Sequence, residues 1–180
     1  SPGTPQQLGE GRELLRSIVD FSERLVREVM TPRPDIVGVR AEATLDELRT
    51  FYREQGYSRI PVYKDSLDNI VGMVFVKDLI TRDDHDVTTP VTAIMRPAHF
   101  VPETKKVPAL LHEFQRARVQ SAIVVDEYGG TAGLVTLEDI DGIRNPKAYF
   151  FQIAKSIVLM HVRRSRVVSI QAVEQLEQLH

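Results

Sequence analysis

The chain has 180 residues and contains no cysteine and no tryptophan. Without cysteine it has no disulfide and no thiolate metal ligand, which fits a reducing compartment. Long hydrophobic runs are missing as well. The best candidate, residues 148–160, is interrupted by Gln152, Lys155 and Ser156, whereas a membrane helix needs about 20 consecutive apolar residues. The N-terminus lacks the charged start and apolar core of a signal peptide, and we therefore expect a soluble piece of protein.

A strong excess of one charge is also absent. The formal net charge is −2, which argues against nucleic acid as the main partner. No Walker loop, GxGxxG or Ser/His/Asp set is present, so we expect no catalytic residue and no enzyme. His99 and His112 have no partner at ligand spacing, and we expect no metal site made by the protein itself. The acidic run at residues 83–86 is interpreted as a hydrated linker, and the basic run at residues 163–166 as a solvated face.

What the sequence does contain is an internal repeat, and a repeat constrains the architecture more than any other pattern. Three stretches return in order: residues 29–32, 57–62 and 70–79 return as residues 94–97, 120–125 and 131–140. The offset between matched residues falls from 65 (Met30 to Met95) through 63 (Ser58 to Ser121) to 61 (Asp78 to Asp139). Small deletions in loops would produce this drift.

Each repeat has the hydrophobic pattern of a β-α-β-β-α unit. In the first repeat, residues 36–39 predict a short strand, and Thr44-x-x-Glu47 is a capping box that opens a helix, which stops at Gly56. Two further strands and a short helix follow. Because a unit of this size is marginally stable alone, we predict an α/β (α+β) fold in which the two repeats pack sheet to sheet with pseudo-twofold symmetry.

An amphipathic helix precedes the repeats, because apolar residues recur at steps of three or four between Leu14 and Val29. The predicted organisation is a flexible N-terminus (1–13), a connecting helix (14–29), the first repeat (30–81), a polar linker (82–90), the second repeat (91–140) and a partly helical tail (141–180).

The second repeat carries a polar pair that indicates a ligand site. Thr136 and Asp139 lie three residues apart where a strand ends and a helix begins. Free backbone N–H groups at a helix N-terminus favour an anion. A fixed carboxylate accepts hydrogen bonds from both hydroxyls of a ribose, and a threonine hydroxyl bonds to sugar or phosphate oxygens. The same spacing is also an ordinary helix-capping signature, so the pair alone leaves both interpretations open.

The duplicated pattern resembles a pair of CBS domains, a family that binds adenine nucleotides in clefts between two repeats. The resemblance implies that Thr136 and Asp139 hold the ribose and that Arg59 meets phosphate. It assigns the full polar set of one cleft to Thr31, Ser58, Arg59, Thr136 and Asp139.

The pseudo-equivalent cleft has lost this set. It combines Phe75, Asp78, Arg96, Ser121 and Ala122. In this alignment a ring replaces the threonine hydroxyl, and a methyl group replaces the arginine. The losses fall together in one cleft and the retained groups in the other, and we therefore expect one working cleft.

Several motifs narrow the resemblance to the cytosolic CBS pair of CorC/CNNM-type magnesium and cobalt transporters. They are REVMTPR at residues 27–33, GYSRIPVY at 56–63, VKDL at 76–79 and VDEYGGT at 125–131. The resemblance spans about residues 14–140 and implies ATP or AMP as ligand, with Mg²⁺ bound through the phosphates. It also implies a homodimer, a transmembrane domain in the parent chain, and a place on the cytoplasmic side of the cell membrane. Residues 141–180 do not match the family's acidic continuation.

Adenine needs a flat apolar slot, and we predict Ile36, Val37 and Ile60 as its walls. Ordinary strand core explains these three residues equally well. Tyr57 either stacks on the base or simply packs. The predicted function is an adenine-nucleotide-sensing regulatory module. The alternatives are a ligand-free dimerisation module, a CBS regulatory insert of a soluble enzyme, and a nucleotide hydrolase, for which Glu138 would be the nearest base.

Overall fold

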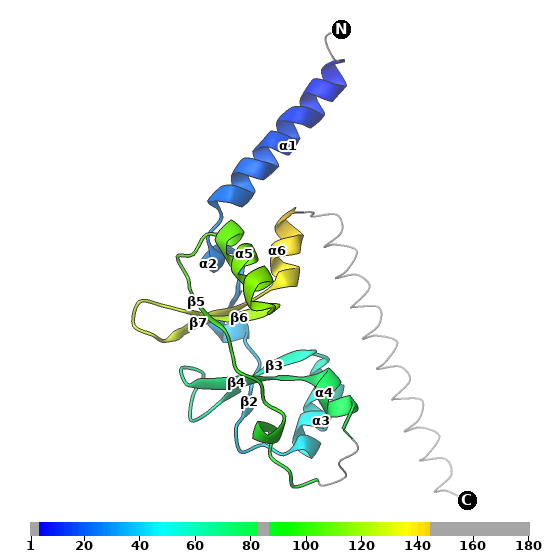
Figure 1. Ribbon diagram of the computed structural model, residues 1–180, viewed down its shortest axis with the longest axis vertical. Helices are drawn as coiled ribbons and strands as arrows, with labels where there is room; N and C mark the ends of the chain where they lie inside the picture. The colour runs from blue at the N-terminus through cyan, green and yellow to red at the C-terminus, as the bar shows by residue number, and fades with distance from the viewer. Residues whose placement is uncertain (1–3, 83–86, 145–180) are drawn as a thin grey trace, which may run out of the picture. The chain divides into compact units, whose positions relative to one another are not determined.

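The computed structural model describes residues 4–82 and 87–144. Two mixed α/β repeats follow an N-terminal helical segment (Figure 1), and this architecture confirms the predicted fold. The first segment comprises α1 (Pro5–Glu23) and α2 (Val26–Val29). The first repeat comprises β1 (Thr31–Pro32), η1 (Arg33–Asp35), β2 (Val39–Arg40), α3 (Leu45–Gln55), β3 (Arg59–Tyr63), β4 (Ile70–Phe75) and α4 (Val76–Ile80). The second comprises η2 (Val91–Ala93), β5 (Phe100–Pro102), α5 (Val107–Ala117), β6 (Ser121–Val125), β7 (Thr131–Thr136) and α6 (Leu137–Arg144).

Three of the expectations fall on parts of the chain that the structure does not describe. The acidic run at residues 83–86, the basic run at residues 163–166 and the helical part of the tail all lie outside the described residues.

The N-terminal helix differs from the prediction of one helix over residues 14–29 after a flexible segment. Helix α1 already begins at Pro5, since proline suits the first position of a helix. The helix stops before Leu25, whose backbone is extended. The following N–H groups of Val26 and Arg27 donate to the carbonyls of Lys105 and Glu103, at 2.8 and 3.1 Å. Pairing with the second repeat therefore breaks the helix. In the described part of the chain, no helix has the length and apolar character needed to cross a membrane.

Local signals in the first repeat are partly confirmed. The Thr44 side chain accepts the N–H of Glu47, the Glu47 carboxylate accepts the N–H of Thr44, and Gly56 ends the helix at φ 75°. The predicted strand at residues 36–39 is wrong except for Val39. The Pro-rich sequence before it forms the 3₁₀ helix η1 instead, and the strand runs over Val39–Arg40.

The two repeats exchange their leading segments. Strand β1 leaves the first repeat and pairs antiparallel with β7, so that one sheet has the order β1-β7-β6-β5 and the other β2-β3-β4. In the second repeat, the backbone of Arg96 pairs in the same way with Met73 of β4, with N–O distances of 2.8 and 2.9 Å. Each sheet is thus completed by the other repeat, and this exchange generates the pseudo-twofold relation.

Each sheet packs against its own helices, and the two sheets face each other. Separate apolar clusters lie under α3 and α4 and under α5 and α6. A third cluster joins Ile70 and Met73 of β4 to Ile123 of β6, with Leu134 of β7 packed against it. The predicted sheet-to-sheet packing is therefore present.

The hydrogen bonds between strands correct the alignment of the repeats. Val62 pairs with Gly72, and Val124 pairs with Gly133, so Val62 matches Val124 and the offset from β3 to β6 is 62, whereas the offset from β4 to β7 is 61. The predicted offset of 63 matched Ser58 to Ser121 by residue type. The true counterpart of Ser58 is Gln120, and that of Arg59 is Ser121. A hydroxyl group, not a methyl group, therefore stands where the first repeat has its arginine.

Glycine is required where the exchanged segments cross the last strands. A Cβ added to Gly133 would lie 2.6 Å from the carbonyl oxygen of Thr31, and one added to Gly72 would lie 2.8 Å from that of Arg96. The main chain cannot move aside as the end of a flexible side chain can. The two crossing segments must therefore move apart to accommodate an added methyl group.

Replacing Gly133 with alanine tests this packing. We expect Gly133→Ala to lower the free energy of unfolding by about 1 to 3 kcal/mol, the usual cost of overpacking, in urea denaturation. Gly11→Ala is the matched control, since nothing lies within 4 Å of its Cβ position. It should leave the midpoint unchanged or raise it. An equal midpoint for Gly133→Ala and the native chain would contradict the close crossing.

Candidate functional site

The polar pair of the second repeat lies at the junction of β7 and α6. The carboxylate of Asp139 accepts the backbone N–H of Thr136 at 2.8 Å and its hydroxyl at 3.0 Å. The hydroxyl in turn accepts the N–H of Asp139 at 3.3 Å. Burial raises the pKa of Asp139, although the bonds from Thr136 counteract part of this shift. The carboxylate is therefore fixed in place by neutral partners.

Arg59 reaches this junction from the first repeat. Its Nη1 donates to the two carboxylate oxygens of Glu138 at 3.1 and 3.3 Å, and its Nη2 donates to the side-chain oxygen of Gln120. Burial alone would raise the pKa of Glu138, but its own backbone N–H and the charge of Arg59 hold the pKa below its ordinary value. A cation from one repeat is thus placed beside the ribose-binding candidates of the other.

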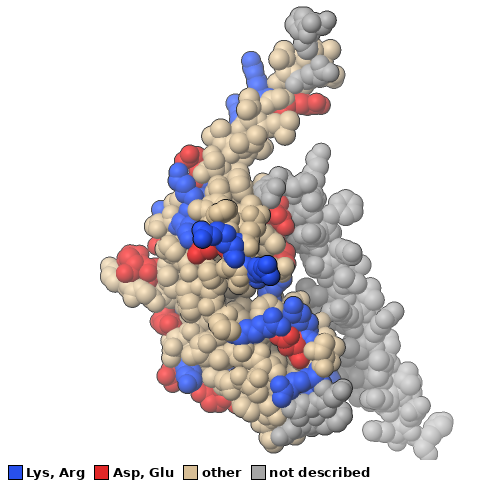
Figure 2. Space-filling view, viewed as in Figure 1, with Lys and Arg blue, Asp and Glu red and all other residues tan. Residues whose placement is uncertain are grey.

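A cavity of about 260 Å³ lies next to Arg59. Polar and charged side chains from both repeats line it together with apolar ones. The lining residues are Tyr52, Ser58, Arg59, Phe75, Val76, Lys77, Ile80 and Gln120. Figure 2 shows Lys and Arg side chains on both repeats of this face, over α5 in one and over α3 and α4 in the other.

In the pseudo-equivalent cleft, the aspartate is bound by an arginine of the same cleft. Arg96 donates through Nε to Asp78 Oδ2 at 2.8 Å and through Nη2 to Oδ1 at 2.6 Å, a two-point contact. Its guanidinium also lies 4.9 Å from the centre of the Phe75 ring. The hydrogen bond to Asp78 raises the pKa of Arg96. The carboxylate that matches Asp139 already has a cationic partner.

The other predicted site residues lie at different depths. Thr31 is on β1, opposite Leu134 of the strand that ends at Thr136. Ser58 lies on the surface and lines the cavity beside Arg59. Tyr57, directly before it, is 49% exposed.

The three apolar residues predicted as adenine walls also differ in how far they are exposed. Ile36 is buried and Val37 half-buried, directly after η1, which lies alongside β7. Ile60 is 0% exposed and packs in the first core cluster. This burial favours the core alternative for Ile60, and its role as an adenine wall stays a prediction.

Three residues of the site were not predicted as ligand contacts. Glu138 was noted only as a possible base, and Gln120 and Lys77 were not considered. The repeat alignment contains the signal for them: Gln120 matches Ser58, and Lys77 matches Glu138 at an offset of 61.

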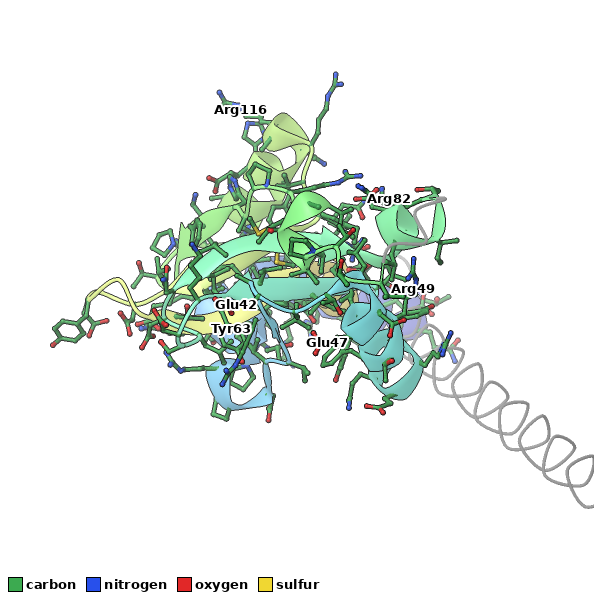
Figure 3. All side chains as sticks on the ribbon, turned by 90° about the horizontal axis from the view of Figure 1, so that it is seen from below. Glu42, Glu47, Arg49, Tyr63, Arg82 and Arg116 are labelled. Atoms are coloured by element: carbon green, nitrogen blue, oxygen red, sulfur yellow. The ribbon has the colours of Figure 1, made fainter. Side chains whose placement is uncertain are left out.

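Two further cavities are present, and the first of them shares Tyr52, Val76 and Ile80 with the cavity beside Arg59. One, of about 530 Å³, is bordered by Arg49, Arg53 and Arg82, and Figure 3 shows Arg49 and Arg82 on the side of α3 and α4. The other, of about 520 Å³, contains both described histidines, and His99 Nε2 lies 3.2 Å from Glu113 Oε1. Among the residues that the structure describes, no group of three or more His, Cys, Asp or Glu side chains could hold a metal ion.

Two repeats that exchange leading strands and enclose a cleft beside their pseudo-twofold axis define a CBS-domain pair. The family model for the CBS domain matches residues 26–84 and 91–143. The magnesium and cobalt efflux protein CorC of Escherichia coli is 38% identical over 131 residues, which are 72% of this chain and 44% of CorC.

Solved structures agree with this match. The CBS domain of a bacterial CNNM/CorC family Mg²⁺ transporter in complex with ATP is 47% identical, with a TM-score of 0.71 over 75% of this chain and 96% of that one. A CBS-domain pair with bound AMP from Klebsiella pneumoniae is 31% identical, with a TM-score of 0.56 over 66% of this chain and 95% of that one. The chain belongs to the CBS domain family, as a tandem pair of the CorC/CNNM magnesium and cobalt transporter type. It spans between 20% and 47% of the length of the curated relatives that it matches.

The raised pKa of Asp139 gives the site a defined pH dependence. A buried carboxylate whose folded-state pKa is raised costs stability above that pKa, and the cost disappears as the pH falls below the unfolded-state value of about 3.9. We expect Asp139→Asn to be more stable than the native chain at neutral pH, with a difference that shrinks on acidification. Urea unfolding across this pH range measures it. A difference that grows on acidification would contradict the burial of the charge.

Proposed function

We propose that this chain is the nucleotide-sensing module of a magnesium or cobalt transport protein and that it binds ATP or AMP in the Asp139 cleft. One observation carries the proposal: Asp139 is held by neutral groups of Thr136, whereas its counterpart Asp78 is bound by Arg96. A carboxylate with neutral partners accepts hydrogen bonds from ribose hydroxyls. A carboxylate engaged by a guanidinium must first lose that partner.

The groups around Asp139 suit the rest of an adenine nucleotide. Thr136 and Thr31 supply hydroxyls on adjacent strands, and Ile36 and Val37 supply apolar surface beside β7. Arg59 supplies a planar cation of the kind that binds phosphate oxygens at two points. The related CBS structures with ATP and with AMP support this class of ligand.

Mg²⁺ enters the proposal through the phosphates. Arg59 already forms an ion pair with Glu138. A phosphate that binds Arg59 therefore lies close to the Glu138 carboxylate, and the two negative groups repel each other. Mg²⁺ on the phosphates reduces the resulting repulsion. No ligand for the ion is required from the protein.

The role in the parent protein follows from the relatives. CorC is described as a magnesium and cobalt efflux protein, and we infer a transmembrane domain in the parent chain with this module on the cytoplasmic side. A ligand shifts such a module only if it binds one arrangement of the repeats, or of a homodimer of pairs, more tightly than another. A nucleotide held by both repeats meets this condition.

Substitution of matched carboxylates tests the assignment of one working cleft. We expect Asp139→Ala and Arg59→Ala to weaken ATP binding by about 10- to 100-fold, since a hydrogen bond to a charged group contributes about 1.5 to 3 kcal/mol. Asp78→Ala, the matched control, should leave the affinity unchanged. Calorimetric titration with ATP, ADP and AMP, each with and without Mg²⁺, measures these affinities. Equal losses at Asp78 and Asp139 would refute a single working cleft.

A second experiment addresses Glu138. Glu138→Gln removes the charge that competes with phosphate for Arg59 and keeps the size of the side chain. We expect it to tighten binding of Mg²⁺-free ATP by about tenfold and to reduce the effect of Mg²⁺. Glu127→Gln, in the exposed turn between β6 and β7, is the control for net charge. An identical gain in both variants would show that the contact with Arg59 is irrelevant.

A further inference from the structure

The cavity of about 520 Å³ on the second repeat is lined mainly by ionisable side chains. Lys105 precedes α5, and His112, Glu113 and Arg116 lie on it, while His99 comes from the segment before β5. Glu113 is the one carboxylate among the described residues that line the cavity. Strand β6, whose Ile123 N–H donates to the carbonyl of His99 at 2.7 Å, adds no ionisable side chain. His99 therefore shares the cavity with one acid, two permanent cations and a second imidazole.

The carboxylate of Glu113 is shared by two groups, one on each oxygen. Its Oε2 accepts a hydrogen bond from Lys105 Nζ, and its Oε1 lies 3.2 Å from His99 Nε2. The bond from Lys105 holds the pKa of Glu113 below its ordinary value, so the carboxylate is charged at neutral pH. Because the two groups use different oxygens, a positive charge on His99 does not have to displace Lys105.

The ring of His99 has an unsatisfied nitrogen at this point. Its Nε2 is buried and makes no hydrogen bond within the described part of the chain. In a neutral imidazole that carries its proton on Nδ1, this nitrogen presents a lone pair to the carboxylate. Protonation makes it a charged donor, and a small movement then completes a hydrogen bond to Oε1. Imidazole titrates near pH 6.5 (about one proton between pH 5 and 8), so this change occurs in the physiological range.

Lys105 connects this group of side chains to the base of α1, which lies beside α5 (Figure 1). The carbonyl of Lys105 accepts the N–H of Val26 at 2.8 Å, and the next residue forms a bridge with Leu25. A Lys105 side chain that is fixed by Glu113 restrains the loop that makes these bonds. The strength of the contacts at Glu113 therefore influences the attachment of α1.

We propose that His99, Glu113 and Lys105 form a proton-dependent contact that holds the base of α1 more firmly on the second repeat when His99 is charged. The folded protein offers the imidazolium a partner that the unfolded chain lacks. The gain in stability is therefore present at low pH and is lost as the pH rises through the range in which imidazole titrates. The proposal is independent of nucleotide binding, because none of the three residues lines the cavity beside Arg59.

Amide hydrogen exchange, followed by NMR on the full-length chain at about pH 7.5 and about pH 5.5, tests this contact. The protection of each amide is taken relative to its unstructured rate at the same pH. The reference is the N–H of Val91, which donates to Ala43 in the first repeat. We expect the protection of Val26, relative to Val91, to rise about two- to fivefold on acidification, the range of a partly exposed ion pair.

Four variants identify the groups responsible. His99→Gln and Glu113→Gln should each abolish the rise at Val26. His112→Gln is the matched control and should behave as the native chain, because it removes the other imidazole of the cavity, which in the described ranges has no carboxylate within ion-pair distance. Lys105→Met should lose the rise while the His99 ring still titrates in its proton chemical shift. Thermal unfolding at neutral pH verifies that each variant is folded. Glu113→Gln, which keeps the size of the side chain, provides the test if His99→Gln does not fold.

Three results would overturn the proposal. The first is a native chain without the rise, or a rise that persists in His99→Gln or Glu113→Gln. The second is an equal loss in His112→Gln and His99→Gln, because the charge of the whole cavity would then explain the effect. The third is an unchanged rise in Lys105→Met, which would show that α1 is not held through this side chain.

Discussion

The exchange of leading strands is the constraint on which the rest of the structure depends. Main-chain hydrogen bonds attach β1 to β7 of the other repeat and attach the backbone of Arg96 to β4. Glycine at the two crossings lets the backbones approach closely. Because each sheet is completed by a strand from the other repeat, each cleft is formed by residues of both repeats. Residues more than 70 positions apart in sequence, such as Arg59 and Glu138, meet as a direct result.

The two clefts share the same backbone arrangement but contain different side chains. In one cleft, threonine stands on the exchanged strand, and the half-buried aspartate accepts hydrogen bonds from neutral donors only. In the other, arginine stands at the matching position, binds the aspartate at two points and covers an aromatic ring. An internal ion pair of this geometry needs no ligand to satisfy its carboxylate. The two equivalent positions therefore differ in a few side chains, while the fold around them stays the same.

The sequence predicts much of this, and its failures have physical causes. The repeat, the capping box at Thr44 and the pairing of Thr136 with Asp139 are local patterns, and the structure contains all three. The strand exchange could not be predicted, because hydrogen bonds between distant strands leave little trace in side-chain pattern. The offset of 62 between β3 and β6 was missed for a related reason. The sequence alignment matched Ser58 to Ser121 because both are serines, whereas the true match is defined by the backbone hydrogen bonds between strands. The sequence left two interpretations of Ile60 open because an apolar residue in a strand looks the same whether it faces a ligand or the core, and its burial in the structure favours the core.

The attachment of the N-terminal helix has a mechanical consequence. Residues 24–27 are joined to the loop before α5 by backbone hydrogen bonds from Val26 to Lys105, from Arg27 to Glu103 and from Val107 back to Arg24. Although α1 directly precedes the first repeat in the chain, its base is anchored on the second, the half that carries Asp139. A torque applied to α1 therefore loads the start of α5 before it reaches β1. A force on the helix is therefore transmitted first to the repeat that carries Asp139.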